Sequence, residues 1–276
     1  MYDVPNDANV PSPAKLELIA LDVARKAAEL VASRFGGAVS IGTKTSATDV
    51  VTQTDLDAEV LIRELLFAAT PGCGAIGEEG VTTGARERVQ WIIDPLDGTV
   101  NFLYAVPIFA VSIAAAVDGE FVAGAVVDVL RGEAFSAHQG GGARLNGKPI
   151  VTSDCQSLSA GLVATGFSYS PQLRSLQGEI VGRLLPQARD IRCFGSAALQ
   201  LCWVAMGRID GYFERDIKLW DWAAGALIAE EAGATIELPC PENVGLVIAA
   251  APQVFGPLRS AVEISREGAV RTTMVT

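Results

Sequence analysis

The chain has 276 residues, of which 50% are hydrophobic and 19% charged, a balance that excludes a disordered or fibrous protein. Its 21 basic and 32 acidic residues leave a net charge of −11, which argues against direct binding to a nucleic-acid backbone. The charge still permits one small anionic ligand, provided that bound cations invert the local field.

The five cysteines include no CxxC pair and predict reduced thiols in a reducing compartment. Residues 1–13 are polar and acidic with three prolines, unlike an export signal, and we expect a disordered tail. The most apolar run, residues 106–117, is too short to span a bilayer. These features predict a cytoplasmic protein with no membrane association.

The N-terminal part predicts two helices. Apolar residues at helical spacing indicate a helix over residues 14–35, ended by a glycine pair. Thr54 resembles an N-cap with Asp57 three residues later, so a second helix is expected to run from Thr54 to about Ala69.

Strands dominate the next part of the chain. Residues 89–94 indicate a buried strand, and residues 108–117 and 121–129 flank an Asp-Gly pair that predicts a hairpin. A turn-rich connector follows at 139–147. We therefore place a soft boundary between two lobes near residue 150.

Strands and helices alternate in the second half. Strands are expected at 162–166 and 209–214, and helices at 172–185, 196–206 and 220–232, the last being a final amphipathic helix. This alternation predicts layered α/β packing.

The stretch WIIDPLDGTVNF drives an apolar run into two carboxylates. Asp94 ends the run, where α/β folds place ligands, and Pro95 is expected to turn the chain out of the strand. Asp97 follows, Gly98 permits a tight backbone approach, and Thr99 offers a hydroxyl and an N–H group. N–H groups at a helix start favour an anion such as phosphate.

Two bare carboxylates about 4 Å apart repel by about 4 kcal/mol at an effective dielectric constant of about 20, which calls for a cation or a proton. The ligands are hard oxygens in a chain with one histidine, so Mg²⁺ is favoured over Zn²⁺. Glu78, Glu79 and Asp221 are further acids at element junctions. The alternative is that these acids only cap turns or face solvent.

Two other phosphatase patterns fail. Cys202 and Arg208 fit the C-x₅-R pattern of cysteine-dependent phosphatases, but the stretch is apolar and helical, which indicates a core cysteine and a surface arginine. Aspartyl-phosphate enzymes need D-x-D, and Leu96 occupies the place of the second aspartate.

Several motifs together resemble the inositol monophosphatase family. GEEG at 77–80 resembles its Glu-Glu motif, WIIDPLDGTVNF its first signature and LWDWAAG its second. KTSATDVVTQTD, which begins at Lys44, and GSAALQLCWVAMGRIDGYFE, which begins at Gly195, are similar to further motifs. Val100 departs from the threonine of many members. The resemblance implies a layered α-β-α-β-α sandwich of the inositol monophosphatase or sugar phosphatase type, with residues 14–265 as one two-lobed domain.

The resemblance also implies two or three Mg²⁺ ions per site. Glu78, Asp94 and the carbonyl of Leu96 would hold the first ion. Asp94, Asp97 and Asp221 would hold the second. Lys44 would lie near a weaker third ion.

Catalytic and substrate-binding residues are implied in the same way. The catalytic set would be Glu78, Glu79, Thr99 and Asp55. The substrate would contact Asp97, Gly98, Thr99, Gly195, Ser196, Ala197, Glu214 and Asp221.

The implied activity is Mg²⁺-dependent hydrolysis of a small polyol phosphate, with inositol 1-phosphate as the leading substrate, by activated water and without a phospho-enzyme. Lithium inhibition and a homodimer are implied as well. Histidinol phosphate, fructose 1,6-bisphosphate and NADP are alternative substrates, although a carboxylate at Glu214 would repel a second phosphate. The non-enzyme alternative is a protein-partner role in the transcription or RNA machinery.

Overall fold

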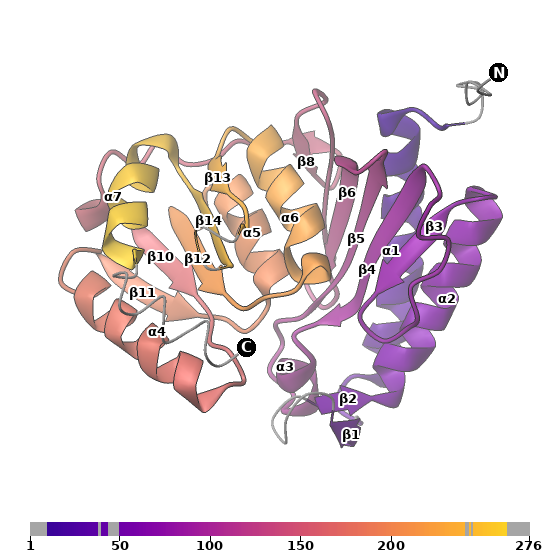
Figure 1. Cartoon of the computed structure of the whole chain (residues 1–276), viewed down its shortest axis with the longest axis horizontal. Helices are drawn as coiled ribbons and strands as arrows, with labels where there is room; N and C mark the ends of the chain where they lie inside the picture. The colour runs from indigo at the N-terminus through magenta and orange to yellow at the C-terminus, as the bar shows by residue number, and fades with distance from the viewer. Residues whose placement is uncertain (1–9, 38–39, 44–49, 241–242, 244, 264–276) are drawn as a thin grey trace.

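Helices and sheets alternate in five layers in this computed structural model, which describes residues 10–37, 40–43, 50–240, 243 and 245–263 (Figure 1). Helices α1 (Pro13–Arg34) and α2 (Gln53–Ala69) cover the outer face of a seven-stranded sheet. Helices α4 (Pro171–Leu184) and α7 (Pro252–Val262) cover the outer face of a five-stranded sheet. The predicted α-β-α-β-α sandwich is therefore confirmed.

The seven-stranded sheet follows chain order, and only its first two strands are parallel. Its strands are β3 (Gly74–Gly77), β4 (Val89–Asp97), β5 (Ala110–Val117), β6 (Glu120–Asp128), β7 (Glu133–His138), β8 (Ala143–Leu145) and β9 (Lys148–Pro149). Alternating side chains bury both faces: Trp91 and Ile93 pack with α1 and α2, whereas Ile92 joins the core between the sheets.

The five-stranded sheet has the order β11-β10-β12-β14-β13, with the first three strands parallel and the other pairs antiparallel. Its strands are β10 (Leu162–Thr165), β11 (Asp190–Cys193), β12 (Gly211–Arg215), β13 (Thr235–Glu237) and β14 (Leu246–Ala250). Phe213 faces α4 and α7, whereas Tyr212 faces the core between the sheets.

Helices α5 (Ala197–Ala205) and α6 (Leu219–Glu231) fill the layer between the sheets (Figure 1). Small residues let this layer pack closely. A Cβ on Gly124 of β6 would lie 3.0 Å from Ala224 Cα, and a Cβ on Gly225 would lie 2.8 Å from Leu201 Cβ. The two helices come from the second half of the chain but cover the inner face of the first sheet.

Short elements complete the fold near the first sheet. Strands β1 (Ser40–Thr43) and β2 (Val50–Thr52) pair with each other, and α3 (Thr99–Leu103) follows β4 directly. A single turn of 3₁₀ helix spans Leu158–Ala160. Within the described residues, no helix is both long and apolar enough to cross a membrane.

Three sequence predictions need correction. The N-cap of α2 is Thr52, because its side chain and that of Asp55 form a capping box; Asp57 instead pairs with Arg34. The helix at 220–232 is not the last, since α7 follows it, and it is apolar on nearly all sides because it lies between two sheets.

Strand β4 also does not end at Pro95, as predicted, but runs on to Asp97. The pairing with β5 is irregular between Asp94 and Asp97, so the missing N–H of Pro95 removes no ladder hydrogen bond. The predicted tail, residues 1–13, lies mostly outside the described residues, and α1 already begins at Pro13 with Ser12 as its N-cap.

Candidate active site

Two of the predicted acidic positions lie at the ends of adjacent strands. Strand β3 pairs in parallel with β4, and the pairing extends past the strand, because the N–H of Glu78 donates to the carbonyl of Ile93 at 3.2 Å. Glu78 therefore comes beside Asp94, the next residue of β4. Parallel pairing thus joins the GEEG motif to the WIIDPLDGT motif.

Asp94 and Asp97 lie on either side of the irregular section of β4, and both are buried. The Asp94 Oδ1 atom accepts a hydrogen bond of 3.0 Å from the N–H of Leu96. The extra residues change the direction of the strand, so both carboxyl groups reach the same end of the sheet.

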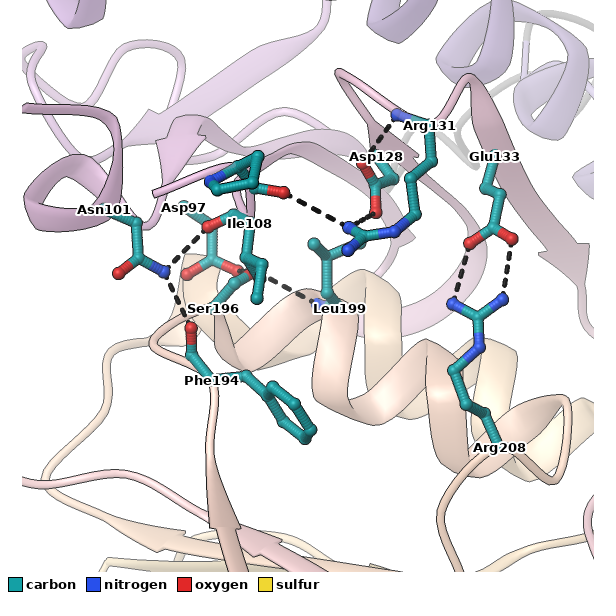
Figure 2. A network of polar contacts seen from close by, with 11 residues as sticks. Asp97, Asn101, Ile108, Asp128, Arg131, Glu133, Phe194, Ser196, Leu199 and Arg208 are labelled. Carbon is teal, nitrogen blue, oxygen red and sulfur yellow. Dashed lines mark hydrogen bonds and ion pairs between the residues drawn. The ribbon is translucent and has the colours of Figure 1, made fainter. Parts of the chain in front are cut away.

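The N-terminus of α5 binds Asp97. The carboxylate accepts a hydrogen bond from the Ser196 hydroxyl (Figure 2). It also accepts hydrogen bonds from Ala198 N at 2.8 Å and from Ala197 N at 3.2 Å. Ser196 is also the N-cap, accepting from Leu199 N at 3.3 Å. Ser196 and Ala197 were predicted as substrate contacts, and here they bind a predicted metal ligand instead.

Asp221 lies in the first turn of α6, where its Oδ2 accepts a hydrogen bond of 2.5 Å from the N–H of Lys218. The helix start therefore positions this carboxylate at the same end of the sandwich as Asp97. The family signature LWDWAAG thus supplies an acid whose position is set by helix capping.

Electrostatics link the four acids. Burial raises the pKa of Asp94 well above its ordinary value, and the charges of Glu78, Asp97 and Asp221 raise it further. Burial raises the pKa of Asp97 to about 6, against hydrogen bonds from α5 that lower it. Burial and then the charges of Asp97 and Glu78 raise the pKa of Asp221. Four carboxyl groups that disfavour one another's ionisation converge on one place.

The donor atoms fit a hard divalent cation, because all of them are carboxylate or carbonyl oxygens and no imidazole or thiol is among them. As the side chains stand, no group of three or more His, Cys, Asp or Glu residues in the described parts of the chain could hold a metal ion. Asp97 and Asp221 are turned toward N–H and O–H donors of the protein. The donor atoms of this group therefore suit Mg²⁺, whereas its carboxyl groups are oriented toward hydrogen-bond donors of the protein.

Thr99 lies next to this group and contacts Asp55. Its buried Oγ1 atom is 3.0 Å from Asp55 Oδ1 and 3.1 Å from the carbonyl of Leu96. The other Asp55 oxygen accepts from Thr52 N at 3.0 Å, through the capping box of α2. A buried carboxylate fixed at a helix start thus orients the hydroxyl of Thr99.

Gly98 allows the chain to turn from β4 into α3. Its φ is +99°, a conformation that favours glycine, and a Cβ there would lie 3.1 Å from the carbonyl oxygens of both Gly195 and Ile108. The backbone of the first sheet therefore approaches the loop before α5 closely.

Asn101 joins the two lobes beside this turn. Its Nδ2 donates to the carbonyl of Ile108 at 2.8 Å and to that of Phe194 at 2.7 Å (Figure 2). A Cβ on Gly195 would lie 2.8 Å from the same nitrogen. Asn101 was quoted in the signature but given no role by the sequence analysis.

Glu214 on β12 is half-buried beneath Gly166. Its Oε2 accepts a hydrogen bond of 2.8 Å from the hydroxyl of Tyr212, and a Cβ on Gly166 would lie 2.2 Å from both carboxylate oxygens. Burial raises the pKa of Glu214 to about 7, despite the lowering effect of Tyr212. The sequence analysis missed Tyr212 and Gly166.

Glu59 on α2 was also missed. Its Oε2 accepts a hydrogen bond of 2.7 Å from the N–H of Glu79, and its side chain is buried. A charged residue on the buried face of a helix, one position after Ala58 and three before Ile62, was the signal that could have revealed it. Lys44 lies outside the described residues.

The structure supports the rejection of the cysteine-phosphatase pattern. Cys202 is buried inside α5, where burial raises the pKa of its thiol, and Arg208 pairs with Glu133 at 2.6 Å. The thiol is therefore no nucleophile.

A pocket of about 460 Å³ lies between the lobes beside the candidate site. Residues of α3 and the following turn line it, among them the polar Asn101 and the aromatic Tyr104. Tyr169, which precedes α4, and Arg174, near the start of α4, also line the pocket. Arg174 Nε donates to the carbonyl of Ser168 at 2.6 Å.

The chain is similar to known proteins over most of its length. The model of the inositol monophosphatase family matches residues 12–265. An inositol-1-monophosphatase SuhB of Mycobacterium tuberculosis is 43% identical, over 91% of this chain and 94% of its own. A Nus factor SuhB of Escherichia coli is 40% identical, over 79% of this chain and 83% of its own. The solved structure of an IMPase of Thermotoga maritima has a TM-score of 0.82 at 30% identity, covering 90% of this chain and 96% of its own.

Proposed function

This chain belongs to the inositol monophosphatase family and is a phosphatase, and we propose that it hydrolyses a small polyol phosphate monoester, inositol 1-phosphate first, with Mg²⁺. The observation that carries the proposal is the convergence of Glu78, Asp94, Asp97 and Asp221, which come from three different motifs, into one electrostatically coupled group. Binding of divalent cations would relieve the repulsion among these carboxylates.

Glu78, Asp94 and the carbonyl of Leu96 would hold one Mg²⁺, and Asp94, Asp97 and Asp221 another. When bound, the ions would neutralise the phosphate dianion, lower the pKa of water and stabilise the leaving oxygen. A third, weaker ion near Lys44 remains part of the proposal.

Thr99 would orient the attacking water. Its hydroxyl proton is directed toward Asp55 or the carbonyl of Leu96, so a lone pair of Oγ1 is available to accept a hydrogen bond from water. Glu78 and Glu79, at the adjacent strand end, would take up the proton of the water, and direct attack would leave no phospho-enzyme intermediate.

The phosphate and the alcohol would occupy opposite parts of the site. The N–H groups of Gly98 and Thr99 would bind the phosphate. Gly195, Ser196, Ala197 and Glu214 would face the alcohol, and Glu214 would accept hydrogen bonds from its hydroxyl groups. Binding of a ligand would require Ser196 and Ala197 to share their donors with Asp97.

Phosphate release across a substrate panel tests the function. The panel contains inositol 1-phosphate, histidinol phosphate, fructose 1,6-bisphosphate and NADP, each with Mg²⁺, with EDTA and with Li⁺. We expect the highest kcat/KM for inositol 1-phosphate, no turnover in EDTA and inhibition by Li⁺. Turnover that survives EDTA would contradict the metal-dependent reaction.

Fructose 1,6-bisphosphate is the alternative that one observation favours. Arg174 lines the pocket beside the site, and no carboxylate in the described residues pairs with it, so it could bind a second phosphate. Glu214 opposes this substrate by charge. A higher kcat/KM for the bisphosphate than for inositol 1-phosphate, lost in Arg174→Ala, would support this alternative.

A role in transcription through a protein partner is the second candidate, because the relative in Escherichia coli is named a Nus factor. The charge of −11 disfavours direct RNA binding. Asp94→Asn separates the two functions: loss of phosphatase activity with retained binding to the transcription complex would show an independent role.

We further propose a cytoplasmic homodimer. None of the five cysteines forms a disulfide, which suits a reducing compartment. Light scattering of the purified protein at several concentrations tests the dimer.

A further inference from the structure

The turn that carries Glu78 and Glu79 rests on a buried ion pair of α2. Glu59 is only 2% exposed, and its Oε1 atom lies 2.7 Å from Nε of Arg63, one helical turn later. Its other oxygen, Oε2, accepts the N–H of Glu79 at 2.7 Å. One carboxylate therefore connects the helix to the turn.

Two glycines let the turn lie directly on this pair. A Cβ on Gly77 would be 2.2 Å from Glu59 Oε1, and a Cβ on Gly80 would be 2.3 Å from the same atom. The Gly80 Cβ would also be 2.8 Å from Nη2 and 2.9 Å from Nε of Arg63. No side chain fits at either position unless the ion pair moves.

Consecutive N–H groups of the turn are bound to different elements. Glu78 N donates to Ile93 on β4, and Glu79 N donates to Glu59 on α2. These two N–H directions fix the peptide planes on either side of the Glu78 Cα. They therefore determine the direction in which the side chain of Glu78 leaves the backbone, toward Asp94.

We propose that Glu59, held by Arg63, is a positioning residue that directs Glu78 and Glu79 toward the metal-binding carboxylates. The inference rests on the proposed function, because it assigns Glu78 to the metal group. The pair does not contact substrate; it acts through the backbone of residues 77–80. Glycine at 77 and 80 is required for the same reason.

The test measures Mg²⁺ binding as well as turnover. In Glu59→Ala, we expect the Mg²⁺ concentration for half-maximal activity, and the Kd from calorimetry, to rise about 10-fold or more, as for other residues that orient metal ligands. KM for inositol 1-phosphate at saturating Mg²⁺ should change less than threefold. Glu59→Gln, which keeps an acceptor for Glu79 N but loses the ion pair, should fall between Glu59→Ala and the wild type.

Gly80→Ala tests the same contact without removing a charge, and should also weaken Mg²⁺ binding. Glu64→Ala, an exposed acid on the same helix, and Gly182→Ala, where an added Cβ meets nothing within 4 Å, are the matched controls. Both controls should bind Mg²⁺ as the wild type does. If Glu59→Ala does not fold, Glu59→Gln and Gly80→Ala decide the question.

Folded variants at Glu59 and Gly80 with wild-type Mg²⁺ affinity, even if less stable to heat, would overturn the inference and leave a purely structural ion pair. That result requires an active wild type. Failure of the wild type to bind Mg²⁺ or to release phosphate would instead contradict the proposed function, so the two failures are distinguishable.

Discussion

The pKa of Asp94 is raised by burial and by all three of the other acids in the group. Its carboxyl is buried, and the charges of Glu78, Asp97 and Asp221 all oppose its ionisation. Its Oδ1 atom accepts a hydrogen bond from the N–H of Leu96, which an amide oxygen could accept equally well. Function and stability therefore place opposite demands on this side chain.

Asp94→Asn should lower kcat at least about 100-fold, because it removes a ligand proposed for both ions. Without divalent ions, the same variant should be more stable than the wild type by about 1 kcal/mol or more, because a repelling charge is lost. Turnover and thermal unfolding in EDTA measure both effects. Near-normal turnover would contradict the two-metal assignment.

Glu214 predicts a pH-dependent KM. Burial raises its pKa to about 7, so the carboxylate that would accept substrate hydroxyls is mostly protonated at lower pH. The fraction ionised rises roughly 10-fold between about pH 6 and pH 8, and KM for inositol 1-phosphate should fall over that range. Steady-state kinetics across this range measure the effect.

The control is Glu214→Gln, in which this component of the pH profile should disappear. The variant should also weaken polyol substrates more than a plain aryl phosphate. Equal losses for both substrates would contradict a role of Glu214 in recognising hydroxyl groups.

At the scale of elements, the side-chain amide of Asn101 connects helix α3 to the loop before α5. Asn101 donates to the carbonyls of Ile108 and Phe194 at 2.8 and 2.7 Å. Asn101→Ala should lower the free energy of unfolding by about 1–3 kcal/mol, because two carbonyl groups lose their donor. Denaturant unfolding measures the loss.

Asn101→Asp separates hydrogen bonding from size. It keeps the shape of the side chain but directs oxygen at two carbonyl oxygens, so it should be at least as destabilising as alanine. An aspartate variant as stable as the wild type would show that the two hydrogen bonds contribute nothing.

The longer N-terminal helices, the central strands and the positions of the four acids could be predicted from sequence, because periodicity locates α1 and motifs locate Glu78 and Asp221. Helix α7 and the strands of the five-stranded sheet after β12 were not predicted. Predictions from local sequence were wrong where contacts with other elements determine the structure. Pro95 does not end its strand, because its missing N–H lies in an irregular part of the ladder. Thr52 caps α2 through a capping box with Asp55, a residue that also contacts the distant Thr99.

Long-range contacts of the site could not be predicted. The contact from Glu59 to Glu79 spans 20 residues, and that from Ser196 to Asp97 spans 99. No periodicity within one element reports such a pairing. Tyr212 and Glu214 are two residues apart on one strand, so their proximity is expected, but their bond depends on the space that Gly166 leaves.

For the whole molecule, the carboxylate group makes stability depend on Mg²⁺. Raised pKa values in the folded state mean that stability without divalent ions falls as pH rises above the ordinary carboxyl range toward neutrality. Mg²⁺ at about 100 times its Kd should add about 2.7 kcal/mol. Differential scanning fluorimetry with Mg²⁺ and with EDTA, at pH 6 and pH 8, measures this stabilisation.

Asp94→Asn serves as the control, since it should lose most of the Mg²⁺-dependent increase in Tm. Identical melting temperatures of the wild type in Mg²⁺ and in EDTA would contradict metal binding at this group.

The central layer has a consequence for how the chain can be divided. Residues up to Pro149 build the whole seven-stranded sheet, yet α5 and α6, which cover its inner face, come from residues 197–231. An N-terminal fragment produced alone should therefore aggregate through that uncovered face. Co-expression with the complementary fragment should restore a soluble, active heterodimer, because each piece completes the interior of the other.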